Sequence, residues 1–442
     1  MIDLIPSFGG LIWTVLAFVV ALSVIVFVHE FGHYIVGRWS GIHAEVFSLG
    51  FGPVVWSRVD SQGTRWQLAA LPFGGFVKFL GDANAASGKD AGAINALTPE
   101  QRRATMHGAP LWARSATVAA GPVFNFVLSI LVFAGFFMVM GVATDTPVVG
   151  KMKPMPFEGQ TLLPGDLIVS VAGTPTPDYN TLLTVTEDLP GAPRVAYTVE
   201  RDGQTVDLDG PFPFPPLADA VQPQSAALDA GFQVGDVVTA VDGVPVHAFR
   251  DLRTIVGNSD GKPLTMAVWR DGDTFDLVLT PKRVDLPTDD GFETRWLIGL
   301  SGGLMFEPET RTPGPVEVLK LGAQQTWDIA TTSLSGLWHM VTGAISSCNL
   351  RGPIGIAETS GAAASQGVGS FVAFVAMLST AVGLMNLFPV PVLDGGHLVF
   401  HAYEAVTGKP PTERALQAMM TIGLTLILGL MVFALTNDIF CP

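Results

Sequence analysis

The chain has 442 residues, 48% of them hydrophobic, and a mean hydropathy of +0.43. This composition is too apolar for an ordinary soluble enzyme, and the 49 glycines and 32 prolines are too many for a protein built of helices alone. The formal net charge of −15 argues against binding of nucleic acid or anionic lipid as the main function. We therefore expect membrane-spanning helices combined with folded domains outside the membrane.

The first apolar run covers residues 11–28, where only Thr14 and Ser23 are polar. Extended as a helix to Arg38, it reaches about 40 Å at ~1.5 Å per residue, which is enough to cross a bilayer. No basic segment precedes the run and no small-residue cleavage site follows it. We therefore expect an uncleaved membrane span rather than a signal peptide.

This first span carries three ionisable side chains, His29, Glu30 and His33. Each costs roughly 2.5 kcal/mol or more near the bilayer centre unless it is partnered, so side chains that merely fill space are not expected there. His29 and His33 are four positions apart and leave one face of the helix, where both imidazoles can bind the same metal ion. Glu30 lies beside that ion and suits a general base that takes a proton from water.

The loop after the first span contains three segments that favour extended strands, residues 54–59, 64–70 and 72–79. Many of its residues are aromatic. One interpretation is a small hairpin with its own core. The other is a β-sheet at the membrane interface, beside the metal helix, that offers an edge strand to an extended peptide.

Basic residues near the predicted spans set the expected orientation. They are Arg38, Arg102, Arg103, Arg114, Lys409 and Arg414. Because positively charged loops stay in the cytoplasm, the metal helix is expected to run from outside to inside, with its histidines toward the cytoplasmic leaflet. A second span over residues 112–142 then returns to the outside. Gly121 and Asn125 near its start allow close helix approach and require a polar partner, which indicates a structural role.

The next region, residues 143–284, contains an internal repeat. The segment at 164–173 aligns with that at 234–243, and Arg-Asp-Gly at 201–203 aligns with Arg-Asp-Gly at 270–272. Each Asp-Gly predicts a hairpin between β-rich runs. The pattern resembles PDZ domains, which take a peptide as an added strand at a sheet edge. Two tandem PDZ-like α+β domains are therefore expected outside the membrane, in the periplasm of a Gram-negative cell.

The second of these copies is the better match to the PDZ pattern. Ser225-Ala226-Ala227 leads into it, whereas residues 158–161 of the first copy lack this lead-in. Peptide recognition is accordingly less expected in the first copy. Beyond the repeat, residues 313–350 predict a helix of mixed polarity along the membrane surface.

The third span begins near Phe371, and Pro389 and Pro391 break its far end at membrane depth. Broken backbone is tolerated there only where protein or water satisfies it. Asp394 follows the break and would complete three metal ligands, leaving a fourth position for water. From the residues alone, the other side chains that could be this ligand are His397, His401 and Glu404. The last span, residues 415–435, carries no charge and is expected only to pack.

Together these features resemble the site-2 protease family of intramembrane zinc metalloproteases, and most closely its bacterial regulator-of-sigma-E protease branch. The zinc-helix motif of the family matches His29, Glu30 and His33, and its Leu-Asp-Gly motif matches residues 393–395. The resemblance implies that His29, His33 and Asp394 bind Zn²⁺ and that Glu30 is the catalytic acid and base. It covers nearly the whole chain.

The resemblance also assigns residues around this centre. The family segment Asn-x-x-Pro-x-Pro corresponds to Asn386, Pro389 and Pro391, which are implicated in holding substrate, and the Gly-x-x-x-Asn feature matches Gly121 and Asn125. Residues 72–82, with Gly74 and Gly75, resemble the membrane-associated β-loop and are expected to bind substrate. Residues 352–357 resemble the element before the third span.

The function implied is hydrolysis of a peptide bond in or near the membrane helix of single-span proteins, typified by an anti-sigma factor already cut outside the membrane. The PDZ-like domains would dock a newly exposed C-terminus or exclude uncut proteins by bulk. The main alternative is a non-hydrolytic membrane scaffold whose zinc is structural; a zinc transporter is a further one. A structural zinc should be closed by four protein ligands, whereas the motif offers three and a base.

The expected layout is a polytopic α-helical membrane protein of about four transmembrane helices. Residues 1–142 would hold two spans, the metal motif and the cytoplasmic β-loop, and residues 143–214 and 215–284 the two PDZ-like domains. Residues 285–365 would be a linker with the surface helix, and residues 366–442 the last two spans. Cys348 and Cys441 could form a single disulfide, but two free thiols are expected.

Overall fold

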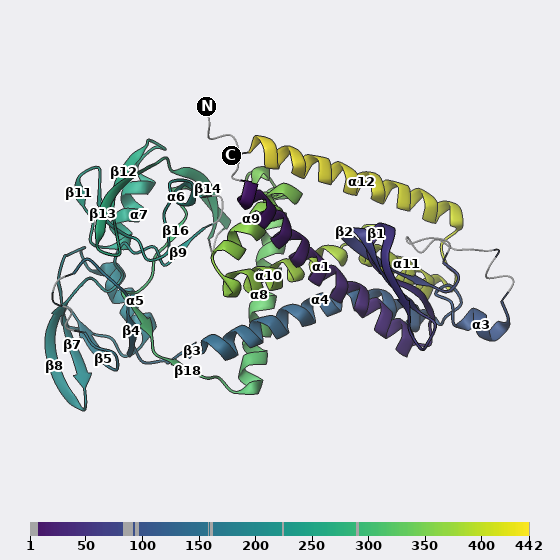
Figure 1. Ribbon diagram of the computed structural model, residues 1–442, viewed down its shortest axis with the longest axis horizontal. Helices are drawn as coiled ribbons and strands as arrows, with labels where there is room; N and C mark the ends of the chain where they lie inside the picture. Colours follow the sequence, from purple (N-terminus) through teal and green to yellow (C-terminus); the bar gives the residue numbers. More distant parts are fainter. Residues whose placement is uncertain are drawn as a thin grey trace. The chain divides into compact units, whose positions relative to one another are not determined.

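The computed structural model describes residues 8–82, 92, 97–157, 159, 162–222, 225–288 and 291–441. The chain divides into two compact units. The first combines residues Met1–Phe136, Pro315–Trp338 and Ser347–Pro442, and the second combines Phe137–Gly314 and His339–Ser346. Each unit is described by itself (Figure 1).

Four helices of the first unit are long and apolar enough to cross a membrane. They are α1 (Phe8–Trp39), α4 (Leu111–Met140), α10 (Val368–Asn386) and α12 (Glu413–Phe440). Large apolar side chains on their outer faces are exposed, for example Leu131 and Leu426. Such surfaces suit contact with lipid rather than water. The prediction of a polytopic helical membrane protein is confirmed at this level.

Small residues let these helices pack backbone against backbone. A methyl group on Gly32 of α1 would lie only 2.5 Å from the Ala120 carbonyl oxygen of α4, so only glycine fits this crossing. The shorter helix α9 (Pro353–Ser365) packs along α1, where Gly361 lies against Thr14. The long helix α8 (Pro315–Val341), on the segment predicted as a membrane-surface helix, places Gly322 against the backbone of α4.

Two long strands, β1 (Ala44–Val59) and β2 (Arg65–Phe79), form the sheet between the first two spans. Both strands double back, so Phe47 of β1 faces Trp66 on one side and Val77 on the other. Gly50, at φ +90°, makes the bend in β1 possible, since that backbone conformation is strained for other residues. All three predicted extended segments lie in this sheet, and residues 75–79 form one of its edges.

Asp60 ties the turn of this hairpin to α1. Its Oδ1 accepts the backbone N–H groups of Gln62 at 2.9 Å and Thr64 at 3.0 Å, and its Oδ2 accepts the Tyr34 hydroxyl at 3.1 Å. Although burial acts to raise the pKa of Asp60, these hydrogen bonds outweigh it and hold the pKa below the ordinary value. The sheet is therefore fixed to the helix that carries the histidines. The short helix α3 (Pro99–Arg103) follows before α4.

The second unit contains two modules of the same topology. Each has a four-stranded antiparallel sheet, in the order β6-β5-β7-β8 and β11-β10-β12-β13, and a helix between its second and third strands; the second module has a further short helix before its sheet. The first module consists of β5 (Leu167–Val171), β6 (Thr174–Pro175), α5 (Tyr179–Asp188), β7 (Val195–Arg201) and β8 (Gln204–Gly210). The second consists of α6 (Ala226–Asp229), β10 (Val237–Val241), β11 (Val244–Pro245), α7 (Phe249–Gly257), β12 (Leu264–Arg270) and β13 (Asp273–Leu279). The repeat seen in the sequence is thus a repeat of structure.

Short strands after residue 284 pair back onto both modules. In the first, β4 (Val149–Met152) pairs with β17 (Phe306–Pro308), and in the second, β9 (Ala220–Val221) pairs with β16 (Leu300–Ser301). The chain thus leaves the first module, builds the second and returns to the first. The remaining pairs are β14 (Lys282–Thr288) with β15 (Gly291–Leu297), and β3 (Val142–Ala143) with β18 (Thr310–Arg311). The domain limits at 214 and 284 stay predictions. The segment 158–161, which lacks the Ser-Ala-Ala lead-in of the second copy, lies mostly outside the described residues.

In each copy of the repeat, an aspartate forms an ion pair with an arginine more than 30 residues further along the chain. Asp166 accepts two hydrogen bonds of 2.7 Å from the Arg201 guanidinium, and Asp236 accepts bonds of 2.6 and 2.7 Å from Arg270. Each carboxylate also accepts a backbone N–H three residues upstream. Both aspartates are buried, so the pair fastens the loop before the first strand to the far hairpin.

The two cysteines do not stay free, contrary to expectation. Cys348 and Cys441 form a disulfide that joins the 3-10 helix η1 (Ser347–Asn349) to the end of α12. Next to it, Asp438 caps α9 by accepting the Gly352 backbone N–H at 2.8 Å. The last span therefore does more than pack, because its end is fixed covalently and by charge to the start of α9. The sequence placed these residues 93 positions apart and gave no sign that they meet.

The first prediction concerns the Asp166 pair. Burial acts to raise the pKa of Asp166, but hydrogen bonds from Arg201 and the Leu163 backbone outweigh it and hold that pKa below its ordinary value. Asp166→Asn should lower the free energy of unfolding by about 2–3 kcal/mol at neutral pH. The pair stabilises fully above the unfolded pKa near 4 and fails as the pH falls through the lower folded pKa. The difference between variant and parent should therefore shrink below about pH 4.

Chemical unfolding of the purified full chain at several pH values measures this difference. Asp276→Asn, at an exposed position of β13, is the matched control and should change stability little. A loss in Asp166→Asn that is no larger than in Asp276→Asn at neutral pH would contradict the assignment.

Candidate metal centre and active site

Helix α1 presents His29 and His33 on one face, with their Nε2 atoms 3.2 Å apart. Asp394, the first residue of α11 (Asp394–Thr407), meets them there. Its Oδ2 lies 3.2 Å from His29 Nε2 and 3.5 Å from His33 Nε2. Among the residues that the structure describes, these three form the one group of histidine, cysteine or acidic side chains close enough to share a metal ion.

This triangle of ligand atoms fits zinc. Ligands bound at 2.0–2.1 Å in a tetrahedron lie about 3.4 Å apart, close to the observed separations of 3.2, 3.2 and 3.5 Å. Asp394 Oδ2 is buried and has no hydrogen-bond partner among the residues that the structure describes, which would be costly for a carboxylate that had no cation. Two imidazoles and a carboxylate are also a donor set that zinc accepts in catalytic sites.

Helix α4 holds the far side of each imidazole. His33 Nδ1 lies 2.8 Å from the Thr117 carbonyl oxygen, which can only accept, so Nδ1 carries the proton and Nε2 is free to bind metal. His29 Nδ1 lies 3.2 Å from Asn125 Nδ2, and Asn125 Oδ1 is buried with no hydrogen-bond partner among the described residues. With that oxygen turned toward Nδ1, both groups are satisfied and His29 takes the same tautomer.

Gly121 makes room for this arrangement. A methyl group there would lie 2.3 Å from His33 Nε2 and 2.8 Å from His29 Cε1. The position is therefore occupied by the rings themselves, and any side chain would displace them. Asn125, expected to have a structural role, and Gly121 both lie directly against the ligands.

The proline segment brings Asp394 into place. Residues 387–393 join α10 to α11, and the chain turns so tightly that a methyl group on Gly395 would lie 2.3 Å from the Leu387 carbonyl oxygen. Gly396 is equally confined, 2.2 Å from the Val390 oxygen. The two glycines after Asp394 are thus required by close backbone approach. Pro391 packs against Gly423 of α12.

The other residues that the sequence left open as ligands have different partners. Glu404 forms an ion pair with Arg114, and His401 Nδ1 lies 3.2 Å from the Ser115 hydroxyl. His397 follows Asp394 by one turn of α11 but is not part of the group of three. The structure brings together His29, His33 and Asp394, and leaves His397, His401 and Glu404 outside that group.

Glu30 lies next to the ligands and under the edge of the sheet. A methyl group on Gly75 of β2 would come within 3.1 Å of Glu30 Cγ, so the edge strand passes directly over this side chain. Gly74, at φ +137°, lies against the Phe51 ring. Asn386 ends α10, where its side-chain amide donates to the Val382 carbonyl at 3.1 Å.

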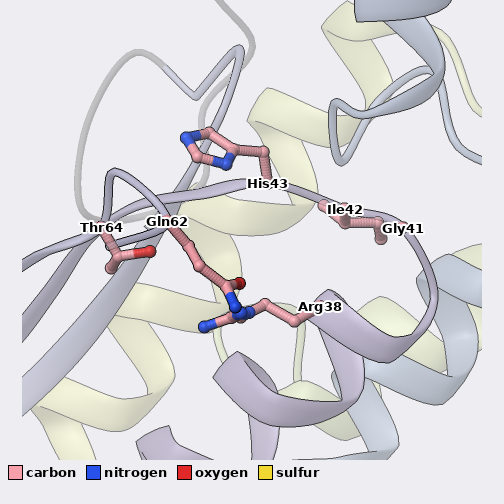
Figure 2. Close-up of a pocket in the computed structure, with 6 residues that line it drawn as sticks. All are labelled: Arg38, Gly41, Ile42, His43, Gln62 and Thr64. Atoms are coloured by element: carbon pink, nitrogen blue, oxygen red, sulfur yellow. The ribbon is translucent and has the colours of Figure 1, made fainter. Parts of the chain in front are cut away.

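A pocket of about 190 Å³ lies apart from this group, where α1 ends and β1 begins. Figure 2 shows its lining, Arg38, Gly41, Ile42, His43, Gln62 and Thr64. Arg38 lies 3.8 Å from Asp60, which compensates its charge. The arginine of this pocket is therefore compensated, and none of the lining residues belongs to the group of three possible metal ligands.

The second prediction tests the fit at Gly121. Gly121→Ala should weaken zinc binding by about 10–100-fold, because the added methyl displaces both imidazoles. Metal content of the purified protein and zinc release to a chelator measure the effect.

Gly135→Ala, on the same helix with open space around the glycine, is the control. It should keep its zinc and gain up to about 1 kcal/mol of stability from the better helix former. Equal zinc affinity in the two variants would show that α4 does not confine the rings.

Comparison with known proteins agrees with this centre. The model of Peptidase family M50 matches residues 17–430. An inferred zinc metalloprotease of Agrobacterium fabrum is 35% identical over 99% of both chains, and another of Rhizobium meliloti is 36% identical over 97% of this chain and 96% of its own. The regulator of sigma-E protease of Salmonella typhimurium is 34% identical over 97% of this chain and 99% of its own.

The matched range includes the metal helix, the repeated modules and the proline segment. A zinc-dependent peptidase of the site-2 type, held in the membrane by several helices, accounts for both the triad and the apolar helices around it. The chain belongs to Peptidase family M50 and is an intramembrane zinc metalloprotease.

Proposed function

We propose that His29, His33 and Asp394 hold the zinc ion and that Glu30 is the catalytic acid and base. The observation that carries this proposal is that His29 Nε2, His33 Nε2 and Asp394 Oδ2 lie 3.2–3.5 Å from one another. Glu30 directly follows His29 in the same apolar helix. Three protein ligands leave the fourth position for water and substrate, as in catalytic zinc sites.

Bound zinc supplies a Lewis acid that polarises the scissile carbonyl and lowers the pKa of water toward ~7. Glu30 takes the proton of the attacking water and returns it to the leaving amine. Thr117 and Asn125 keep both imidazoles in the tautomer whose Nε2 can bind metal. The surrounding helices exclude bulk water, which strengthens each of these interactions.

The substrate is proposed to be the membrane helix of a single-span protein. Its amides are hidden in helical hydrogen bonds, so it has to unwind before attack. The edge strand at residues 75–79, with Gly74 and Gly75, lies over Glu30 and can bind the unwound segment as an added strand. Asn386, Pro389 and Pro391, next to Asp394 in the chain, would hold its other side.

One relative is named for regulating sigma E, which favours an anti-sigma factor, already cut outside the membrane, as the substrate type. The two modules of the second unit are proposed to be PDZ-like domains in the limits 143–214 and 215–284, extended by the strands that return after residue 284. They would dock a newly exposed C-terminus or exclude uncut proteins by bulk.

The chain is proposed to lie in the bacterial inner membrane with these modules in the periplasm and the metal centre toward the cytoplasmic leaflet. The basic residues near the spans support this orientation. The Cys348–Cys441 disulfide supports it independently, because disulfides persist in the periplasm and are rare in the cytosol. The scaffold alternative is less favoured, since a structural zinc would not need an open position beside a glutamate.

The third prediction separates catalysis from metal binding. Glu30→Gln should keep its zinc and lose cleavage by about 10²–10⁴-fold, because the proton acceptor is gone while the ligands remain. A tagged single-span substrate in detergent, with bound zinc measured in parallel, gives both quantities. If the parent protein holds zinc and cleaves none of several unstable single-span helices, the scaffold alternative is favoured.

The fourth prediction tests orientation on intact Gram-negative cells. A membrane-impermeant maleimide should label Cys348 and Cys441 only after treatment with an impermeant reductant, because both residues lie in a periplasmic disulfide. A cysteine introduced at Ser61, in the exposed hairpin turn, should stay unlabelled until the cells are opened. Labelling of the cysteine at position 61 in intact cells, with Cys348 and Cys441 unlabelled even after reduction, would show the opposite orientation in the membrane.

A further inference from the structure

Arg114, near the start of α4, makes a two-pronged ion pair with Glu404 of α11. Arg114 Nη2 donates to Glu404 Oε1 at 2.6 Å, and Nη1 donates to Oε2 at 3.1 Å. Its Nε donates to the Ala109 carbonyl at 3.1 Å, so the guanidinium plane is fixed from both sides. The side chains are only 16% and 18% exposed, which protects the pair from competing water.

The pair lies at the opposite end of the helix that carries Asp394. Ten positions separate Asp394 from Glu404, about 15 Å along α11 at ~1.5 Å per residue. Phe400 is buried and Leu398 packs against a core cluster of the first unit, so one face of this short helix is held by apolar contacts. Apolar contacts have little directional preference, so the polar contacts are the ones that fix the helix in one position and direction.

The face of α4 that bears Arg114 also bears the contacts to both histidines. Arg114, Thr117, Gly121 and Asn125 are spaced by three or four residues, which places them along one side of the helix. Thr117 and Asn125 orient His33 and His29, and Gly121 receives both rings. The same helix face thus reaches all elements that supply ligands.

We propose that Arg114 and Glu404 are positioning residues that fix α11 on α4, so that Asp394 meets the two histidines at bonding separation. The ion pair acts at one end of α11 and the carboxylate ligand at the other, with the Ser115–His401 contact between them. A fork of two parallel hydrogen bonds fixes direction as well as distance, which a single ammonium group does not. Arg114 therefore has a role beyond its positive charge at the membrane interface.

This inference rests on the proposed ligand set, and its test separates the two. The variants are Glu404→Gln, Arg114→Gln, Arg114→Lys and the double Gln variant, each as full chain in detergent. Asp394→Asn in the same assay tests the ligand itself, and Glu293→Gln, which breaks the exposed Arg295–Glu293 pair on β15, is the matched control. Zinc release to a chelator is measured together with Tm of the zinc-stripped protein, kcat and KM.

Glu404→Gln and Arg114→Gln should each speed zinc release roughly tenfold, because α11 then holds Asp394 less firmly against the two histidines. The double variant should be no faster than either single one, because both remove the same link. Arg114→Lys should fall in between, since it keeps the charge and loses the fork. In all of them kcat should fall while KM changes little, and Glu293→Gln should match the parent protein.

Two results would overturn the proposal. Zinc release at the parental rate with a lowered Tm of the stripped protein would make the pair a support of the fold alone, and effects that multiply in the double variant would show that the two side chains act separately. If Asp394→Asn itself retains zinc as the parent does, the ligand set is wrong, and the positioning role falls with it.

Discussion

Ionisable side chains inside an apolar helix have to be neutralised within the protein, and the first unit is arranged around that requirement. His29, Glu30 and His33 lie in a helix apolar enough to cross a membrane, and α4 and α11 bring partners to the two histidines. The partners of the two imidazoles are a backbone carbonyl, a side-chain amide and a carboxylate, each within 3.5 Å. A cation at this point satisfies the Asp394 oxygen that otherwise has no partner.

Close approach of helices is the second constraint, and glycine meets it. Gly32 and Gly121 let α1 and α4 touch at the level of the imidazoles, and Gly395 lets the chain fold back behind Asp394. The sheet approaches in the same way through Gly75, which lies against Glu30. The two histidines, Glu30 and Asp394 are thus brought together by elements that pack backbone against backbone.

The second unit repeats one stabilising device. In each module a buried aspartate receives the fork of an arginine from a distant hairpin, and the sheet order is the same. The strands that return after residue 284 join the modules, because the first is completed only after the second has been built. Such an arrangement couples the folding of the two modules.

The sequence by itself determined the spans, the repeat and the metal motif. Helical spacing fixes His29 and His33 on one face, and apolar runs and aligned Gly-Asp segments need no long-range information. Tertiary structure decided that Asp394 meets the two histidines while His397, His401 and Glu404 lie outside their group, and it also decided the Asn125 contact, the Cys348–Cys441 bond and the late strands β16 and β17. All of these join residues far apart in the chain, and their sequence signals are single residues or two- to three-residue strands. The periodicity of apolar residues in a sequence indicates which face of a helix or strand a side chain lies on, whereas the residues it contacts are determined by tertiary packing.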